Sequence, residues 1–169
     1  MIARKLGLIY ARNMSIEISE RKEHILDFLK QNSTAVLATA NKYGEPHAAT
    51  IYYTVDEDLN IYFITKRDTT KSQNLKNSGR GALAVHEATT QTTVQAVGKV
   101  EEETDVNKSQ KVFSDILKIS METSESGTPP ISKLQAGPYI AYRLTPDSAR
   151  MASFIRPDSG SYERIFEDA

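Results

Sequence analysis

The sequence predicts a mainly β protein, with a closed antiparallel barrel of six or seven strands and a few flanking helices. Apolar and polar residues alternate with period two in several short segments of about six residues, which is typical of strands with one buried face. Tyr, Val, Ile and Thr are frequent in these segments, and the connections between them are short, which favours antiparallel neighbours. Closure into a barrel removes the exposed edges that so many antiparallel strands would otherwise leave.

The first expected element is an amphipathic helix over residues 20–32, and Ser19 is suited to cap it. Three strands in a meander come next, separated by the turns "NKYGEP" and "DEDLN". These strands are expected at residues 34–40, 47–55 and 61–65. The apolar face of the helix covers about two turns and consists of Ile25, Leu26, Phe28 and Leu29.

Two further alternating segments, residues 81–87 and 92–103, extend the sheet to five strands. Thr104 is expected to cap a second helix over residues 105–119, which should pack against the sheet. The apolar residues at helical spacing in this helix are Val106, Val112, Phe113, Ile116 and Leu117.

The last strands of the barrel are expected in residues 139–154, as one strand, a turn at Pro146 and Asp147, and a second short strand. No repeat or composition shift divides the chain, so a single domain is expected. The expected organisation is a flexible N-terminal extension at 1–18, the barrel domain at 19–155 with a mobile polar loop at 120–137, and a C-terminal tail at 156–169.

The composition excludes several classes of function. The 169 residues include no cysteine, which excludes disulfides, thiolate metal sites, iron–sulfur clusters and a cysteine nucleophile. With 21 basic and 22 acidic residues and a net charge of -1, the chain has no overall field that would attract nucleic acid or an anionic membrane. The leader has cations but no signal-peptide cleavage pattern, and no apolar run reaches the roughly 20 residues that span a bilayer. We therefore expect a cytoplasmic protein, whose natural start is either Met1 or Met14.

The stretch "IYFITKRDTTKSQNL", residues 61–75, combines the end of a strand with the start of a helix. Thr65 shares a face of the strand with apolar residues, so its hydroxyl lies at the strand's rim. A helix that starts near Thr69 or Thr70 has free N–H groups in its first turn, and Lys71 adds a positive charge beside them. These groups suit a phosphate, although an ordinary capped helix with solvated lysines has the same pattern.

A fixed order of features continues on both sides of this stretch. The run "TAVLATANKYGEPHAATIYYTVDEDLNIYFITKRDTTKSQNLKNSGRGALAV" contains a strand, a Gly-x-Pro turn, a strand, an acidic turn, a strand that ends in Thr, and a helix that begins with Lys. In this order, residues 33–103 resemble the FMN-binding split-barrel family related to pyridoxamine 5'-phosphate oxidase. The resemblance implies a split barrel that forms a homodimer, with FMN in the cleft between the two barrels.

The resemblance also implies roles for individual residues. Thr65 and Lys71 match the positions that contact the flavin phosphate. Thr70 falls where the oxidase usually has an arginine, and Ala49 falls near another phosphate-binding arginine. Two cations of the full oxidase pattern are therefore missing.

The flavin ring is expected to lie along the strand "HAATIYYTV", bordered by Thr50, Ile51 and Tyr52. A slip of one residue in register would exchange Ile51 for Tyr52 on the face that meets the ring. Thr92 and Thr93 fall near the ring-contacting Arg-Gln pair of the oxidase and keep only hydrogen-bonding capacity. Residues 142–154 lack the Arg and His pattern that holds pyridoxine phosphate, which argues against true pyridoxamine-phosphate oxidase activity.

The function that the resemblance implies is an FMN-dependent oxidoreductase that passes hydride between a nicotinamide or small substrate and the flavin. No side chain stands out as an acid or base, so no catalytic residue is assigned. One alternative is a non-catalytic protein that holds flavin or haem. Another alternative is a deazaflavin-dependent reductase, in which Lys66 and Arg67 would form a basic path for the longer tail of that cofactor. If the cofactor is FMN, the same two residues could replace the missing phosphate-binding arginines.

The three histidines, His24, His47 and His86, are isolated in the sequence, and no dedicated metal site is expected. His47 and His86 lie at expected strand ends and could meet at a barrel rim, which leaves a haem ligand open. The tyrosines are not interleaved with a basic stripe, so they are expected in the barrel wall or a dimer interface and not in a nucleic-acid platform. The residues concerned are Tyr52, Tyr53, Tyr62, Tyr139 and Tyr142.

Overall fold

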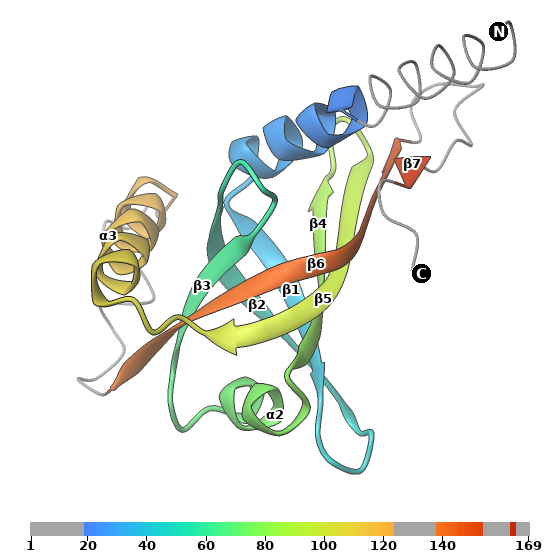
Figure 1. Cartoon of the computed structure of the whole chain (residues 1–169). Coiled ribbons are helices and arrows are strands. Elements are labelled where there is room, and N and C mark those ends of the chain that lie inside the picture. Colours follow the sequence, from blue (N-terminus) through green and yellow to red (C-terminus); the bar gives the residue numbers. More distant parts are fainter. Residues whose placement is uncertain (1–18, 124–137, 154–162, 165–169) are drawn as a thin grey trace, which may run out of the picture.

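The computed structural model describes residues 19–123, 138–153 and 163–164 (Figure 1). The expected extension at 1–18, most of the expected loop and most of the expected tail lie outside the described residues. The helices are residues 19–31, α2 (Thr70–Ser78) and α3 (Val106–Glu122). The strands are β1 (Thr34–Ala40), β2 (Pro46–Val55), β3 (Ile61–Lys66), β4 (Arg80–Glu87), β5 (Thr92–Glu102), β6 (Tyr139–Ser153) and β7 (Glu163–Arg164).

The strands form one antiparallel sheet in the order β3-β2-β1-β4-β5-β6-β7. An additional antiparallel pairing between β3 and β6 closes the first six strands into a barrel. The β1, β2 and β3 strands are the expected meander, and β7 continues the sheet from β6. The prediction of a mainly β closed antiparallel barrel is confirmed.

The barrel interior and the first helix form one apolar core. Alternate residues of β1 point inward, as in Ala35 and Leu37, and the first helix adds Ile25 and Leu29 to the same cluster. Burial of each large aliphatic side chain contributes about 1.5–3 kcal/mol, so this helix is held mainly by its apolar face. Figure 1 shows it at one end of the barrel and α2 at the other. Ser19 already lies inside the helix, so the prediction that it is the cap is wrong.

Helix α3 packs on the outside of the barrel, against β2, β3 and β6. Val112 and Ile116 are buried there beside Tyr62 and Ala141, which confirms the expected contact with the sheet. The helix continues through Glu122, so residues 120–122 are helical and not part of the expected loop.

The cap of α3 is Asp105 and not the expected Thr104. The Asp105 carboxylate accepts hydrogen bonds from the backbone N–H groups of Asn107 and Lys108, at 2.9 and 3.1 Å. Both residue types are good caps, but only the residue that directly precedes the first helical turn can reach these donors.

β6 is a single 15-residue strand, so the turn expected at Pro146 and Asp147 is wrong. The pairing with β5 shifts register between Val97 and Gly98, opposite this proline. Proline has no N–H for the ladder, and a β-bulge accommodates it without ending the strand. A Cβ on Gly98 would lie 2.0 Å from the carbonyl oxygen of Thr145, so the close approach at the bulge requires glycine.

Candidate functional site

The junction between β3 and α2 forms a network of hydroxyl groups. Thr69 is the N-cap of α2, and its Oγ1 accepts from the backbone N–H of Ser72 at 3.4 Å. The same hydroxyl donates to the carbonyl of Lys66 at 3.0 Å and lies 3.0 Å from the Thr65 hydroxyl. Thr65 is only 5% exposed, so it fixes the position of Thr69 from the barrel side. The expected helix start near Thr69 or Thr70 is confirmed.

A cavity of about 410 Å³ opens beside this junction. Its wall is mainly apolar and is built from the outer face of β2 and β3, the first turn of α2, the middle of α3 and the start of β6. The lining residues that the sequence predicted are Thr50, Ile51, Tyr52, Thr65, Lys66 and Lys71. The lining residues that it did not assign to the site are Thr34, Ile64, Thr69, Ile116 and Tyr139. Thus the structure brings together most of the residues expected at the flavin, although they come from separate segments.

The register of β2 decides which of its side chains meet the cavity. The Ile51 side chain packs in the barrel core. Successive side chains of a strand point to opposite faces, so Thr50 and Tyr52 are on the outer face. These two are therefore the β2 side chains available to a ligand in the cavity.

The cavity has a positive electrostatic character at the start of α2. Lys66 and Lys71 line it, and neither forms an ion pair with any residue in the described ranges. Burial lowers the pKa of the Lys71 ammonium, because desolvation disfavours its charged form. The first turn of α2 carries no acidic residue, and helix geometry leaves the N–H groups of Thr70 and Lys71 without intrahelical acceptors. These donors and charges suit an anionic group.

Three residues considered from the sequence lie away from this cavity. Arg67 pairs with Glu102 at 3.2 Å and lines a different cavity, so Lys66 is the cation that the structure leaves beside Lys71. Thr70 is exposed at the start of α2 and does not line the cavity. Thr93 lies on the outer face of β5, where its hydroxyl is 3.1 Å from His86 Nδ1.

His47 and His86 do not meet, so the expectation of a shared barrel rim is wrong. His47 pairs with Thr39, near one end of β1. His86 lies two residues beyond Ala84, which pairs with Val36, and therefore at the level of the other end of β1. Antiparallel register separates the two rings along the strands. Among the described residues, no group of three or more His, Cys, Asp and Glu side chains could hold a metal ion.

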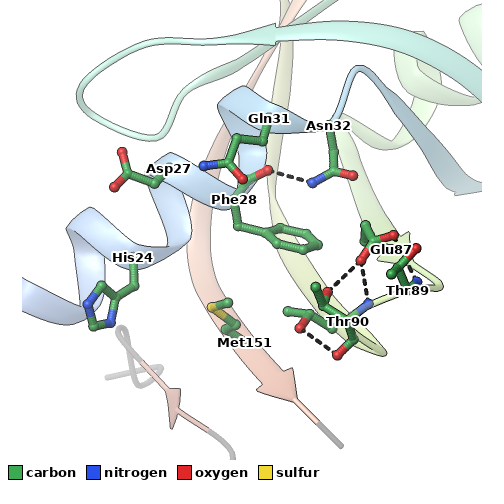
Figure 2. A pocket seen from close by; sticks show the side chains of 10 residues that line it. His24, Asp27, Phe28, Gln31, Asn32, Glu87, Thr89, Thr90 and Met151 are labelled. Carbon is green, nitrogen blue, oxygen red and sulfur yellow. Dashed lines mark hydrogen bonds between the residues drawn. The ribbon is translucent and has the colours of Figure 1, made fainter. Parts of the chain in front are cut away.

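A larger cavity, about 650 Å³, lies between the first helix and the β4–β5 turn (Figure 2). Its Glu87 carboxylate accepts from the backbone N–H groups of Thr89 and Thr90, at 2.8 and 2.6 Å, and from the Thr90 hydroxyl. These bonds lower the pKa of Glu87 to about 2. The Glu87 carboxylate thus stabilises the β4–β5 turn. The cavity of about 410 Å³ beside the β3–α2 junction therefore remains the candidate site.

An uncovered face of the sheet adjoins the candidate cavity. Pairing places the outward side chains of β2, β1, β4 and β5 in two adjacent rows, and no described element covers them. Val36 and Val97 are 45% and 40% exposed there, which is high for aliphatic side chains in strands. We call this face the outer patch; it consists of Val36, Ala38, Ala48, Thr50, Ala82, Ala84, Gln95 and Val97. Contiguous exposed apolar surface of this kind is typical of protein interfaces.

Comparisons with known proteins give a family and a fold. The family model described as "Pyridoxamine 5'-phosphate oxidase" matches residues 22–152. A comparison with curated proteins gave no match. No helix among the described residues is long and apolar enough to cross a membrane.

Three solved structures share the fold. A conserved hypothetical protein from Mycobacterium tuberculosis is 20% identical with a TM-score of 0.64, over 82% of this chain and 91% of its own. General stress protein 26 from Bacillus anthracis is 19% identical with a TM-score of 0.58, over 85% and 97% of the two chains. The haem storage protein HutZ from Vibrio cholerae is 16% identical with a TM-score of 0.55, over 75% and 89%.

Proposed function

Because this chain belongs to the pyridoxamine 5'-phosphate oxidase family, we propose that it is a homodimeric FMN-binding oxidoreductase. The observation that carries the proposal is the presence of Lys66 and Lys71, neither of which pairs with a described acidic residue, in an apolar cavity at the start of a helix. An apolar cavity with a few convergent polar groups is the usual form of a cofactor site. FMN has both parts that such a cavity needs, a flat aromatic ring and a phosphate.

The phosphate end of the site is at the start of α2. Lys66 and Lys71 neutralise the phosphate charge, and the free N–H groups of the first helical turn donate to its oxygens. Thr69 lines the cavity, and Thr65 holds the Thr69 hydroxyl in place. Thr65 thereby acts chiefly as a positioning residue for the phosphate.

The ring end of the site is along β2, where Thr50 and Tyr52 face the cavity. Thr50 belongs also to the outer patch, so a ring placed there lies next to the proposed dimer interface. Pairing of two copies through the outer patch covers the exposed Val36 and Val97 side chains. When bound, FMN supplies the hydride-transfer chemistry; the protein binds it, orients it and excludes water from one side.

The arginines near the end of the barrel do not form a substrate-phosphate site. Arg150 Nε donates to Gln95 at 2.7 Å, and Arg143 lies 3.7 Å from the Glu101 carboxylate. Both guanidinium groups thus contact residues on the outer face of the sheet, while the buried Arg143 Nε makes no hydrogen bond to a described residue. The proposed substrate is therefore a nicotinamide or another small reductant, and not pyridoxamine phosphate.

The first test is the visible absorption spectrum of the purified protein, before and after addition of FMN and removal of the unbound excess. Retained flavin bands, and their bleaching by NADH or NADPH without oxygen, are expected. A protein that retains no FMN under these conditions would refute the proposal. If the protein retains FMN but neither NADH nor NADPH reduces the flavin, only the flavin-binding part of the proposal stands.

A second candidate function is haem binding. It is favoured by the structural similarity to HutZ, which is described as a haem storage protein. Tyrosine is one of the residues that ligate haem iron, and Tyr52 and Tyr139 line the cavity, whereas no histidine is among its described lining residues. A titration with haem, followed by its strong absorption band near the ultraviolet, separates the two candidates.

A further inference from the structure

Tyr139, the first residue of β6, has a hydroxyl with no partner inside the described part of the chain. Its oxygen is buried and makes no hydrogen bond to any described residue, although Tyr139 lines the candidate cavity. A buried hydroxyl without a partner costs free energy, so native proteins rarely retain one without a reason. The nearest available explanation is a ligand in the cavity.

Three tyrosines that are buried as whole residues show how a hydroxyl is satisfied in this fold. Tyr53 donates to the carbonyl of Leu29 at 2.9 Å, and Tyr62 donates to the Asp56 carboxylate at 2.9 Å. The hydroxyl of Tyr142 lies 3.0 Å from that of Ser72. Tyr139 differs from these tyrosines because it borders the candidate cavity and its hydroxyl has no hydrogen-bond partner among the described residues.

The position of Tyr139 is fixed from two sides. Its ring meets the ring of Phe113 in an edge-on contact, with centroids 5.8 Å apart and an angle of 69°. Its backbone pairs with Lys66 across the β3–β6 ladder. Paired residues of antiparallel strands point to the same face, so Tyr139 and Lys66 are neighbours on the cavity side. Lys66 belongs to the phosphate end of the site, and β2 forms the other end.

We propose that the Tyr139 hydroxyl donates a hydrogen bond to the phosphate of the bound flavin, and so selects phosphorylated over unphosphorylated flavin. This inference rests on the proposed function, because it requires a flavin in the cavity. Tyr139 adds a neutral donor to the two lysines. It therefore contributes part of the phosphate recognition that the missing arginines would otherwise supply.

The test is Tyr139→Phe, which keeps the ring contact with Phe113 and removes only the hydroxyl. Dissociation constants for FMN and for riboflavin are measured by quenching of flavin fluorescence, with Tyr43→Phe as the matched control, since Tyr43 is 76% exposed. Tyr139→Phe is expected to weaken FMN binding about tenfold, as for loss of a hydrogen bond to a charged group. Riboflavin binding is expected to change less than about twofold, because riboflavin lacks the phosphate.

Two outcomes overturn the inference: unchanged FMN affinity, or an equal loss for FMN and riboflavin, which would place the bond at the ring or its chain. If the unaltered protein binds neither flavin, the proposed function itself fails. A second readout needs no ligand. The melting temperature of the flavin-free Tyr139→Phe protein should equal or exceed that of the unaltered protein, since the hydroxyl makes no hydrogen bond to a described residue. A clear decrease would indicate that the hydroxyl has a structural role instead.

Discussion

Replacement of Lys71 by alanine is the most direct test of the phosphate site. Lys71 lines the cavity, is half-buried and forms no ion pair with a described residue, so a phosphate is the partner available to its charge. A hydrogen bond to a charged group contributes about 1.5–3 kcal/mol. Solvent screens a half-exposed group, so we take the lower end of this range. About 1.4 kcal/mol corresponds to a factor of ten, and Lys71→Ala should weaken FMN binding at least tenfold.

The assay is a titration of the flavin-free protein with FMN, followed by fluorescence. Lys76→Ala is the matched control, because Lys76 lies in the last turn of the same helix and outside this cavity. FMN binding should weaken with added salt in the unaltered protein, and less so in Lys71→Ala. Equal FMN affinity of Lys71→Ala and the unaltered protein would remove Lys71 from the site and refute the reasoning.

The pKa of Lys71 adds a dependence on pH whose sign can be worked out. Burial lowers this pKa from its ordinary value of 10.5, so the folded protein favours the neutral amine more than the unfolded chain does. The resulting penalty is present while the lysine is charged, at neutral pH, and disappears as the pH rises past the unfolded value. FMN affinity should therefore decrease toward alkaline pH as Lys71 loses its proton, and the flavin-free Lys71→Ala protein should be no less stable than the unaltered protein at neutral pH.

Three further changes test the fold and the proposed interface. Gly98→Ala should destabilise the protein by about 1–3 kcal/mol in urea unfolding, because the new Cβ would meet the Thr145 carbonyl; a midpoint equal to that of the unaltered protein would contradict the bulge geometry. Val36→Arg should convert the proposed dimer to a monomer in light scattering, since Val36 is central in the outer patch; a persistent dimer would locate the interface elsewhere. Asp105→Ala should cost about 1 kcal/mol of stability and Thr104→Ala much less, and the reverse order in thermal unfolding would contradict the observed cap.

Most of the barrel could be predicted from local pattern. Strands β1, β2, β4 and β5 alternate between a more buried and a more exposed face, so their alternation gives both their positions and the side chains that point inward. In β3 the residues Ile61, Tyr62 and Phe63 are all buried, because α3 covers its outer face. The pattern failed in β6 because Pro146 and Asp147 have the composition of a turn. Whether such a pair ends a strand or forms a bulge depends on the partner strand, where Gly98 permits the close approach. Gly98 precedes Pro146 by about fifty residues, so the sequence around the proline does not show that a bulge forms there.

The candidate site, like the barrel, contains some residues that local sequence could group and one that it could not. Thr65 and Lys71 are close in sequence, so the spacing of a strand end and a helix start was enough to group them, whereas Thr69 was expected only as a possible start of the helix. Tyr139 had no such signal, because it reaches the cavity only through the pairing of β3 with β6. That pairing is also the one that closes the barrel. The backbone hydrogen bonds between β3 and β6 therefore have two effects. They remove the last open edges of the six-stranded sheet, and they bring Tyr139, from the C-terminal part of the domain, beside Lys66. A change that opens the β3–β6 seam should for this reason weaken ligand binding before it unfolds the rest of the barrel.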